Sequence, residues 1–179
     1  MRLESLEFTH EQLEEFRLDL FAHDRDVLVE RLRAASERMR VLAQRIPDEP
    51  ASVVHDDWTA REVLAHMAVL SKFYGVAAKK VAGGEWGDFD LLGHVSQRDV
   101  AGEQVAKLSP AQIVDIAFAD HRRTIEFLRA ADPATLARRV KVAEGITMSA
   151  EELCRLGVCA HLELHLEQLE RVLDEDARG

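Results

Sequence analysis

Apolar residues recur at intervals of three and four over most of this chain, the spacing that places them on one face of an α-helix. The first long stripe comprises Val27, Leu28, Leu32, Ala35, Met39 and Leu42. A second comprises Val63, Met67, Leu70, Tyr74, Ala77 and Val81. Similar stripes follow in two later segments. The pattern predicts helices at about residues 9–20, 22–46, 59–82, 110–131 and 149–174.

Capping boxes, in which Ser or Thr precedes Glu or Gln by three residues, mark several of the helix starts. They are Thr9 with Gln12, Thr59 with Glu62, and Ser149 with Glu152. Pro47 and Pro50 end the second helix, and Gly83 ends the third. We expect a loop and a short helix in residues 85–108, and an extended connection at residues 140–142.

Four long helices with an additional short N-terminal helix predict an all-α fold, a four-helix bundle. The chain has 179 residues, which suits one domain with a core, so we expect a single domain over residues 1–179. Hydrophobic residues make up 47% of the chain and charged residues 31%, a globular composition rather than a disordered one.

Charge and the N-terminus exclude several classes of partner. A formal net charge of −10 disfavours nucleic acid and anionic membrane surfaces, because both require a basic surface. Residues 1–8 contain Glu4 and Glu7 and no long apolar run, so we expect no signal peptide. No apolar stretch approaches the roughly 20 residues of a membrane span. We therefore expect a cytoplasmic protein without nucleic-acid or membrane partners.

The two cysteines, Cys154 and Cys159, lie five residues apart on one predicted helix. At about 100° per residue their side chains point about 140° apart, so we expect no disulfide between them. Cys154 shares the face of His161 but lies about 10.5 Å from it along the axis, too far to bind the same metal ion. We interpret it as a small buried hydrophobic residue.

Histidines supply the candidate chemistry. His161 and His165 lie four residues apart in the apolar stripe of the last helix, whereas Glu163 points to the opposite face. His66 borders the apolar stripe of the helix at residues 59–82. Three converging imidazoles would form a divalent-metal site with an open coordination position.

Spacing alone leaves two interpretations of the histidine pair open. A random chain with eight histidines would contain such a pair about one time in three, so the spacing is weak support. Two imidazoles in an apolar stripe need partners, because burying them unpaired costs about 1–3 kcal/mol each. The partners are either a metal ion or carbonyl groups and water. The pair is not of the zincin type, because Leu162 stands where that motif has glutamate.

Asp120 and His121 are the other candidate site residues. Asp120 falls at the centre of the apolar stripe of the helix at residues 110–131, where a carboxylate needs a partner. It is half of an ion pair, a metal ligand, or an acceptor that orients a metal-bound imidazole. His121 lies about 100° from that stripe and is predicted to be solvated. Trp58 and Trp86 flank helix ends and are predicted to anchor packing.

Two segments resemble the DinB/YfiT-like four-helix bundles. Residues 58–67 (WTAREVLAHM) look like the superfamily signature in which a tryptophan and a capping residue precede the helix with the first histidine. Residues 149–153 (SAEEL) and 161–169 (HLELHLEQL) are similar to its last helix, with a His-x-x-x-His pair followed by glutamine. The resemblance covers nearly the whole chain.

By this resemblance, His66, His161 and His165 would be three metal ligands, with water in an open position. The superfamily includes mycothiol-dependent maleylpyruvate isomerases and bacillithiol and other thiol S-transferases. Some members lack the metal residues, whereas this chain has all three. The sequence extends only a short way past the last predicted helix, so we expect it to lack the additional C-terminal domain of the isomerases.

We therefore expect a metal-dependent enzyme that transfers a low-molecular-weight thiol, of the mycothiol or bacillithiol type, to a small electrophile. Its cofactor would be Zn²⁺ or Ni²⁺. Two alternatives stay open: a hydrolase that uses metal-activated water, and a stress-associated binding protein whose histidines are structural. We also expect a homodimer, because Leu13, Phe16 and Leu20 give the N-terminal helix an apolar side to cover.

Overall fold

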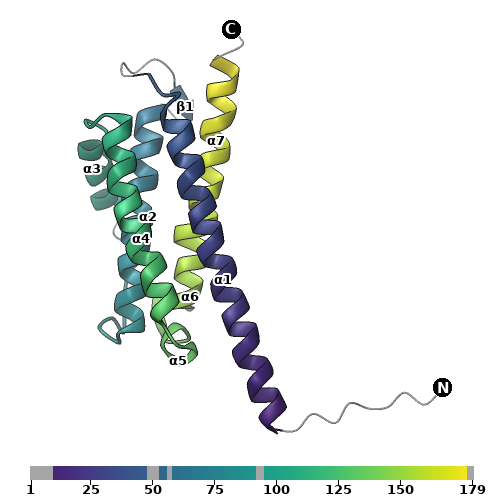
Figure 1. Cartoon of the computed structure of the whole chain (residues 1–179). Helices are drawn as coiled ribbons and strands as arrows, with labels where there is room; N and C mark the ends of the chain where they lie inside the picture. The colour runs from purple at the N-terminus through teal and green to yellow at the C-terminus, as the bar shows by residue number, and fades with distance from the viewer. Residues whose placement is uncertain (1–9, 48–52, 56–57, 92–94, 177–179) are drawn as a thin grey trace, which may run out of the picture.

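The computed structural model describes residues 10–47, 53–55, 58–91 and 95–176, and its long helices lie side by side (Figure 1). The long helices are α1 (His10–Ala43), α2 (Ala60–Ala82), α4 (Pro110–Ala130) and a final helix built from α6 (Ala150–Leu153), the π-helical segment η1 (Cys154–Ala160) and α7 (His161–Asp176). The smaller elements are α3 (Val95–Val105), α5 (Pro133–Leu136), β1 (Val53–His55), β2 (Trp58–Thr59), β3 (Arg139–Ala143) and β4 (Ile146–Ser149). The predicted all-α four-helix bundle is confirmed.

The four long helices form a closed ring in which α1 and α2 each pack against both α4 and α7. In Figure 1, α1 and α7 run in one direction, whereas α2 and α4 run in the other. Because α2 and α4 are parallel, the chain between them must travel back along the bundle. It does so through α3, which packs on α2. The helices that carry the three candidate metal ligands, α2 and α7, are therefore neighbours.

The predicted apolar stripes form most of the core. In α2, every residue of the predicted stripe is buried. In α1, Leu28, Leu32 and Met39 are fully buried. Val27 departs from the prediction, since it is 38% exposed. Among the described residues, no helix combines the length and apolar content that crossing a membrane requires.

The predicted boundaries of α2 and of the final helix are confirmed. Thr59 and Ser149 both form capping boxes, with Glu62 and Glu152. At the other end of α2, Gly83 is the C-cap and Gly84 adopts a φ of 75°, a left-handed conformation that favours glycine. The extended connection expected at residues 140–142 is part of the antiparallel hairpin of β3 and β4.

The separate N-terminal helix predicted at residues 9–20 is wrong, because α1 runs without a break from His10 to Ala43. Neither proline nor glycine occurs in this span, so nothing in the backbone stops a helix that begins at residue 10. The N-terminal part of α1 extends beyond the rest of the bundle (Figure 1). The capping residue predicted for its start, Thr9, lies outside the described residues.

The last helix departs from the uninterrupted α-helix that its sequence pattern predicts. In the π-helical segment η1 the backbone N–H of His161 donates to the carbonyl of Leu156, five residues earlier instead of four. Directions calculated at 100° per residue therefore fail across η1. Cys154 and Cys159, predicted to point apart, are both fully buried. Both are free thiols, as expected.

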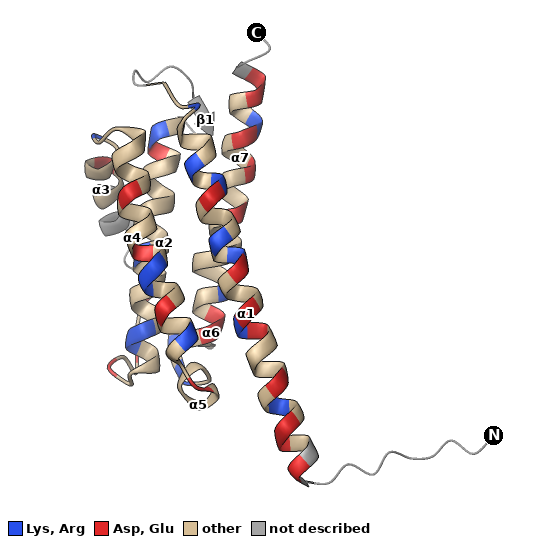
Figure 2. Ribbon diagram, in the orientation of Figure 1, with Lys and Arg blue, Asp and Glu red and all other residues tan. Residues whose placement is uncertain are grey.

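Three ion pairs join α7 to α1 and to the turn that follows α1. They are Arg31 with Glu163, Arg38 with Glu170, and Arg45 with Asp174. Figure 2 shows basic and acidic positions along the adjacent ribbons of α1 and α7. The arginines recur every seven residues, so Arg31 and Arg38 lie on one side of α1, and Arg45 follows in the turn after it. Glu163 therefore faces α1 rather than the histidines, as its predicted direction requires. This row of contacts fixes how α7 lies along α1.

Candidate metal centre

His66 comes from α2, whose start is set by the capping box seven residues earlier. The Oγ1 of Thr59 accepts a hydrogen bond from the backbone N of Glu62 (3.3 Å), and Glu62 Oε2 accepts one from the backbone N of Thr59 (2.7 Å). These contacts satisfy N–H groups that the helix itself cannot pair. They define the register of α2 and with it the face on which His66 lies.

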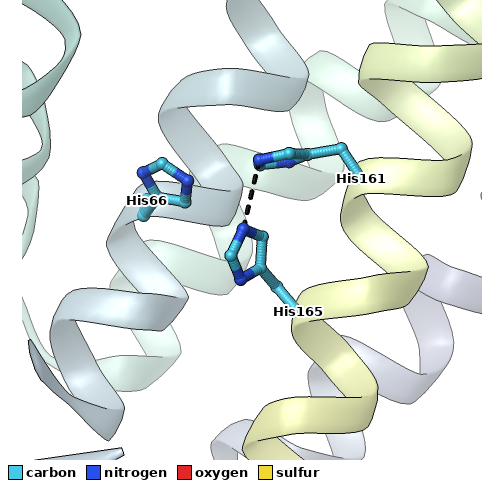
Figure 3. A group of neighbouring side chains, drawn as sticks. All are labelled: His66, His161 and His165. Atoms are coloured by element: carbon cyan, nitrogen blue, oxygen red, sulfur yellow. Dashed lines mark hydrogen bonds between the residues drawn. The ribbon is translucent and has the colours of Figure 1, made fainter. Parts of the chain in front are cut away.

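His161 is the first residue of α7, directly after η1, and His165 follows one turn later. Both side chains point from α7 toward His66 on α2 (Figure 3). The ring centroid of His66 lies 5.2 Å from that of His161 and 4.9 Å from that of His165, and the two α7 rings are 4.4 Å apart. The structure therefore brings the three predicted residues together at one point between two helices.

The three imidazoles fit a divalent ion. Their candidate ligand atoms all lie within 4.8 Å of one another, and the Nε2 atoms of His161 and His165 are 3.1 Å apart. Two nitrogens bound at about 2.05 Å to a tetrahedral ion lie about 3.3 Å apart, so the α7 pair already has this spacing. The other pairs, within 4.8 Å, need side-chain shifts of about 1.5 Å at most. All three residues are half-buried, as a site open to a substrate requires.

Gln168 orients His165. Its Oε1 atom lies 2.8 Å from His165 Nδ1, and an amide oxygen can only accept a hydrogen bond. The proton of a neutral His165 is therefore on Nδ1, which leaves the lone pair of Nε2 facing His161. Imidazoles that bind metal ions are commonly oriented in this way, through a hydrogen bond from the ring nitrogen that does not bind the metal. The sequence prediction did not assign Gln168 to the site, although its i,i+3 spacing from His165 was a usable signal.

Trp58 contacts the site from the other side. Its ring meets the ring of His66 edge to face, with centroids 4.8 Å apart at an angle of 65°. His66 is thus held between Trp58 and the two histidines of α7. The predicted packing role of Trp58 is observed. The sequence did not indicate that Trp58 packs against a candidate ligand. The position of its indole ring depends on how β2 leads into the first turn of α2.

Asp120 forms an ion pair. It is 8% exposed, and its carboxylate lies 2.7 Å from Arg123 Nη1 and 3.8 Å from Lys72 Nζ. Of the three interpretations of its sequence position, the ion pair is therefore the one that its contacts support. We call His66, His161 and His165 the triad. Within the described part of the chain, the Asp120 carboxylate accepts no hydrogen bond from any of these three imidazoles. A role in orienting a metal ligand stays a prediction.

His121 is buried, and the prediction that it is solvated is wrong. It is 2% exposed and lies between three helices, with Nδ1 2.7 Å from Ser36 Oγ on α1 and Nε2 2.9 Å from Ser71 Oγ on α2. The prediction failed because α4 packs against both α1 and α2, so that its buried face is wider than one apolar stripe. Burial lowers the pKa of His121 to about 4, although the nearby charge of Asp120 opposes the shift.

The cysteines take no part in the candidate centre. Burial raises the pKa of both thiols, to about 11 for Cys159. The Sγ of Cys159 lies 3.7 Å from the backbone carbonyl of Leu28 on α1. Both side chains are therefore protonated, fully buried core residues at neutral pH, and a thiolate nucleophile is not available from either.

Comparison with known proteins identifies the family. The family profile of the DinB superfamily matches residues 20–169, which is most of the chain. This chain belongs to the DinB superfamily. The match includes all three histidines. A search of curated proteins finds no match.

Solved structures with the same DinB fold share little sequence with this chain. YfiT from Bacillus subtilis, described as a probable metal-dependent hydrolase with an unusual four-helix bundle topology, is 16% identical, with a TM-score of 0.69. The comparison covers 98% of this chain and 93% of YfiT.

A mycothiol-dependent maleylpyruvate isomerase is similar over a smaller part of its length. It is 13% identical to this chain, with a TM-score of 0.61, and the comparison covers 83% of this chain and 59% of the isomerase. A variant of the same enzyme gives a TM-score of 0.62 at 12% identity, with the same coverage. The chain therefore spans less than two thirds of the isomerase. At these identities the similarity shows the bundle fold that the proteins share.

Proposed function

We propose that this protein is a metal-dependent enzyme that transfers a low-molecular-weight thiol to a small electrophile. The observation that carries the proposal is the convergence of His66, His161 and His165 on one half-buried point. Three neutral imidazoles with an open position are the ligand set of catalytic rather than structural zinc sites. Zn²⁺ and Ni²⁺ both suit imidazole ligands.

The residues around this point have separate roles in the proposal. The three histidines hold the ion, Gln168 fixes the ring and proton of His165, and Trp58 fixes the ring of His66. When bound, a divalent ion supplies Lewis-acid chemistry that lowers the pKa of a thiol or of water.

Within the part of the chain that the structure describes, two carboxylates close in sequence to the three histidines are engaged in other contacts. Glu163, which lies between the two α7 histidines in sequence, binds Arg31 on α1 instead of facing the triad. Glu62, on the first turn of the helix that carries His66, is engaged in the capping box with Thr59. A reaction that needs little proton transfer from the protein, such as thiol transfer, suits this set of residues.

The choice of a thiol as cosubstrate is supported by structural similarity to a thiol-dependent enzyme as well as by the chemistry of the proposed metal centre. The mycothiol-dependent isomerase shares the bundle fold over 83% of this chain. A small thiol such as mycothiol or bacillithiol would be the cosubstrate, and a haloarene or epoxide a suitable test electrophile. Such thiols are kept reduced in the cytoplasm, which is the location expected from the sequence.

Hydrolysis of an ester or amide is the second candidate function. The specific observation in its favour is the similarity to YfiT, described as a probable metal-dependent hydrolase, over 98% of this chain and 93% of YfiT. The triad suits a hydrolase as well, because a metal ion can activate water in the same open position. The two candidates differ in whether turnover requires a thiol.

Metal content is the first test. Protein produced without a histidine tag and exposed to Zn²⁺ or Ni²⁺ should retain about one ion per chain by elemental analysis, because three imidazoles are a sufficient ligand set. His161→Ala should abolish the bound ion. The matched control is His23→Ala, which changes an exposed histidine of α1. Wild-type protein that retains no metal would overturn both the transferase and the hydrolase, in favour of a binding protein with structural histidines.

Thiol dependence is the second test. The metal-loaded protein should consume a small thiol in the presence of an electrophile, measured by loss of free thiol. His66→Ala, His161→Ala and His165→Ala should each reduce the rate by a similar factor, because the ligands act as a unit. Ester or amide turnover without thiol, lost in the same three variants, would establish the hydrolase instead.

A further inference from the structure

The turn immediately before His161 is wider than an α-helical turn. Over η1 (Cys154–Ala160) the backbone bonds at a spacing of five residues, and the last of these bonds joins the N–H of His161 to the carbonyl of Leu156. Such a turn holds one residue more than an α-helical turn. His161 therefore leaves the helix in a direction that differs by about one residue, or 100°, from that of an uninterrupted α-helix.

Burial shows how the wide turn distributes its side chains. Leu156 is 48% exposed, whereas Cys154, Val158 and Cys159 are fully buried. Leu156 therefore points outward, and both cysteines point into the bundle. The turn is consequently anchored on both sides by buried residues rather than being a frayed segment. Figure 1 shows it within the bundle, directly below α7.

Gly157, in the middle of this turn, packs directly against Tyr74 of α2. A Cβ atom at position 157 would lie 2.0 to 2.3 Å from Cγ, Cδ1 and Cδ2 of the Tyr74 ring. No side chain can occupy that position while the ring is in place, since real Cβ contacts are not this short. Tyr74 is only 9% exposed and is itself packed by Phe73, with ring centroids 5.4 Å apart. The ring therefore has little room to move aside.

The contact links the two helices that carry the candidate ligands. Tyr74 follows His66 on α2 by eight residues, about 12 Å along the axis, and Gly157 precedes His161 by four residues, about 6 Å. The separation of α2 from the final helix, next to the site, is set where the ring meets the glycine backbone. A triad drawn from both helices converges only if this separation is right.

We propose that the wide turn η1, held against Tyr74 through Gly157, is a positioning device that aims His161 at His66 and so sets the affinity and geometry of the metal centre. The inference rests on the proposed metal centre. Tyr74 and Gly157 act through His161 and are positioning residues, not ligands. The competing explanation is ordinary core packing, which would affect the stability of the protein and leave the metal centre unchanged.

The test substitutes Gly157→Ala and measures Co²⁺ binding, with Co²⁺ as a spectroscopic probe whose visible absorption depends on the number and geometry of its ligands. Gly157→Ala should weaken Co²⁺ binding about tenfold or more and alter the absorption spectrum, as loss of ligand orientation does elsewhere. Adding Tyr74→Ala to Gly157→Ala should restore part of the affinity, because the smaller residue makes room for the new methyl group.

Two glycines serve as matched controls. A Cβ at Gly75 would lie 2.4 Å from Thr124 Oγ1, a close approach of α2 to α4 on the side away from α7. Gly75→Ala should destabilise the protein in thermal unfolding but leave Co²⁺ affinity within about twofold of wild type. A Cβ at Gly102 of α3 would meet no atom within 4 Å, so Gly102→Ala should leave Co²⁺ binding unchanged and should not lower the stability.

The outcomes separate the inference from the proposed function. Wild-type protein that binds no Co²⁺ would overturn the metal centre, and the inference with it. Wild-type binding together with unchanged affinity and spectrum in Gly157→Ala would overturn the positioning role alone. If Gly157→Ala does not fold, Tyr74→Ala carries the test, since removing the ring should also weaken Co²⁺ binding, and unchanged binding there would overturn the inference.

Discussion

At the scale of single residues, the pairing of Gln168 with His165 determines which nitrogen of that histidine faces the site. The amide oxygen 2.8 Å from Nδ1 selects the tautomer whose Nε2 lone pair is directed toward His161. Without this partner the ring is free to rotate and to carry its proton on either nitrogen. A metal ion would then have to fix the tautomer and the ring, which lowers its binding free energy.

We therefore predict that Gln168→Leu weakens Zn²⁺ binding by about 10- to 100-fold while the protein stays folded. Leucine fills a similar volume but cannot accept the Nδ1 proton. Competition with a chromophoric chelator measures the affinity, and circular dichroism checks the fold. The control is Glu167→Leu, an exposed neighbour on the same helix, which should bind Zn²⁺ as wild type does. Equal affinity of the Gln168 variant would show that His165 needs no orienting partner.

His121 joins three helices through two serines. Ser36 and Ser71 each also lie within hydrogen-bond distance of a carbonyl of their own helix, at 2.7 and 3.2 Å. A hydroxyl has one proton, and a neutral imidazole must accept from one of the serines. We infer that Ser71, whose carbonyl contact is longer, donates to Nε2, and that Nδ1 donates to Ser36. The neutral ring is then satisfied on both sides, whereas a protonated ring would be charged in a buried position.

The free energy of unfolding should consequently depend on the protonation of His121. Burial lowers its folded-state pKa from 6.5 to about 4, so the unfolded chain takes up the proton first as the pH falls. The stabilisation is complete above about pH 6.5 and is lost between there and about pH 4, by roughly 3 kcal/mol in total. We predict that His121→Gln reduces this pH dependence. Urea unfolding at several pH values between 7 and 4 measures it, and parallel pH profiles for the two proteins would contradict the prediction.

At the scale of elements, two adjacent positions of α1 make contacts of different kinds. Arg31 binds Glu163 of α7 through two hydrogen bonds, of which the Nε contact is 2.8 Å, and Glu163 raises the pKa of Arg31. Both partners are about one third exposed, at 32% and 33%. Leu32, the next residue, is fully buried in the core. Water screens the first contact and is excluded from the second.

We predict that Leu32→Ala lowers the free energy of unfolding by about 2–5 kcal/mol and Arg31→Ala by about 1 kcal/mol or less. The buried change leaves a cavity, whereas the ion pair is partly offset by solvation of the separate charges. Denaturant unfolding of both variants gives the comparison. The Arg31 effect should shrink further in molar salt, which screens exposed charges. An Arg31 effect larger than that of Leu32 would show that the α1–α7 ion pairs dominate the association of these helices.

At the scale of the whole molecule, α1 extends past the rest of the bundle (Figure 1). Its N-terminal part exposes apolar side chains. These are Leu13, Phe16, Leu18 and Leu20, with exposed fractions of 47%, 60%, 55% and 48%. Within the described part of the chain, Leu18 and Leu20 line a hollow with residues of α5, but all four side chains stay about half exposed. Apolar surface of this kind on a projecting helix is typical of an interface between subunits. We propose that a second copy of the chain covers it in a homodimer.

Light scattering should accordingly report a particle of about twice 20.2 kDa. Phe16→Glu should shift the protein toward the monomer, because a charge replaces the largest exposed apolar side chain of the projecting segment. Val41→Glu is the matched control, since Val41 is 52% exposed on the same helix but lies within the bundle, and it should leave the dimer intact. A wild-type monomer at micromolar concentration would contradict the proposal.

The sequence by itself determined the elements whose signals are local. The stripe of α2 and the capping boxes at Thr59 and Ser149 involve residues three or four apart, and helix geometry relates such residues directly. The same holds for His161 and His165, whose spacing put them on one face of a helix. With the resemblance to the DinB family, these patterns also named His66 as the third member. The local patterns did not reveal that α1 is one helix. A capping box indicates where a helix starts but does not indicate where the helix ends.

Only the tertiary structure decided what depends on contacts between distant segments. Whether His66 meets the α7 histidines depends on which helices are neighbours in the ring. The burial of His121 depends on a helix that packs against two others at once, which a single apolar stripe does not express. The wide turn before His161 forms where Gly157 meets Tyr74, a contact between residues 83 positions apart. Helical periodicity carries no information about such contacts, because it describes one helix at a time. The packing of the bundle determines which side chains of different helices meet.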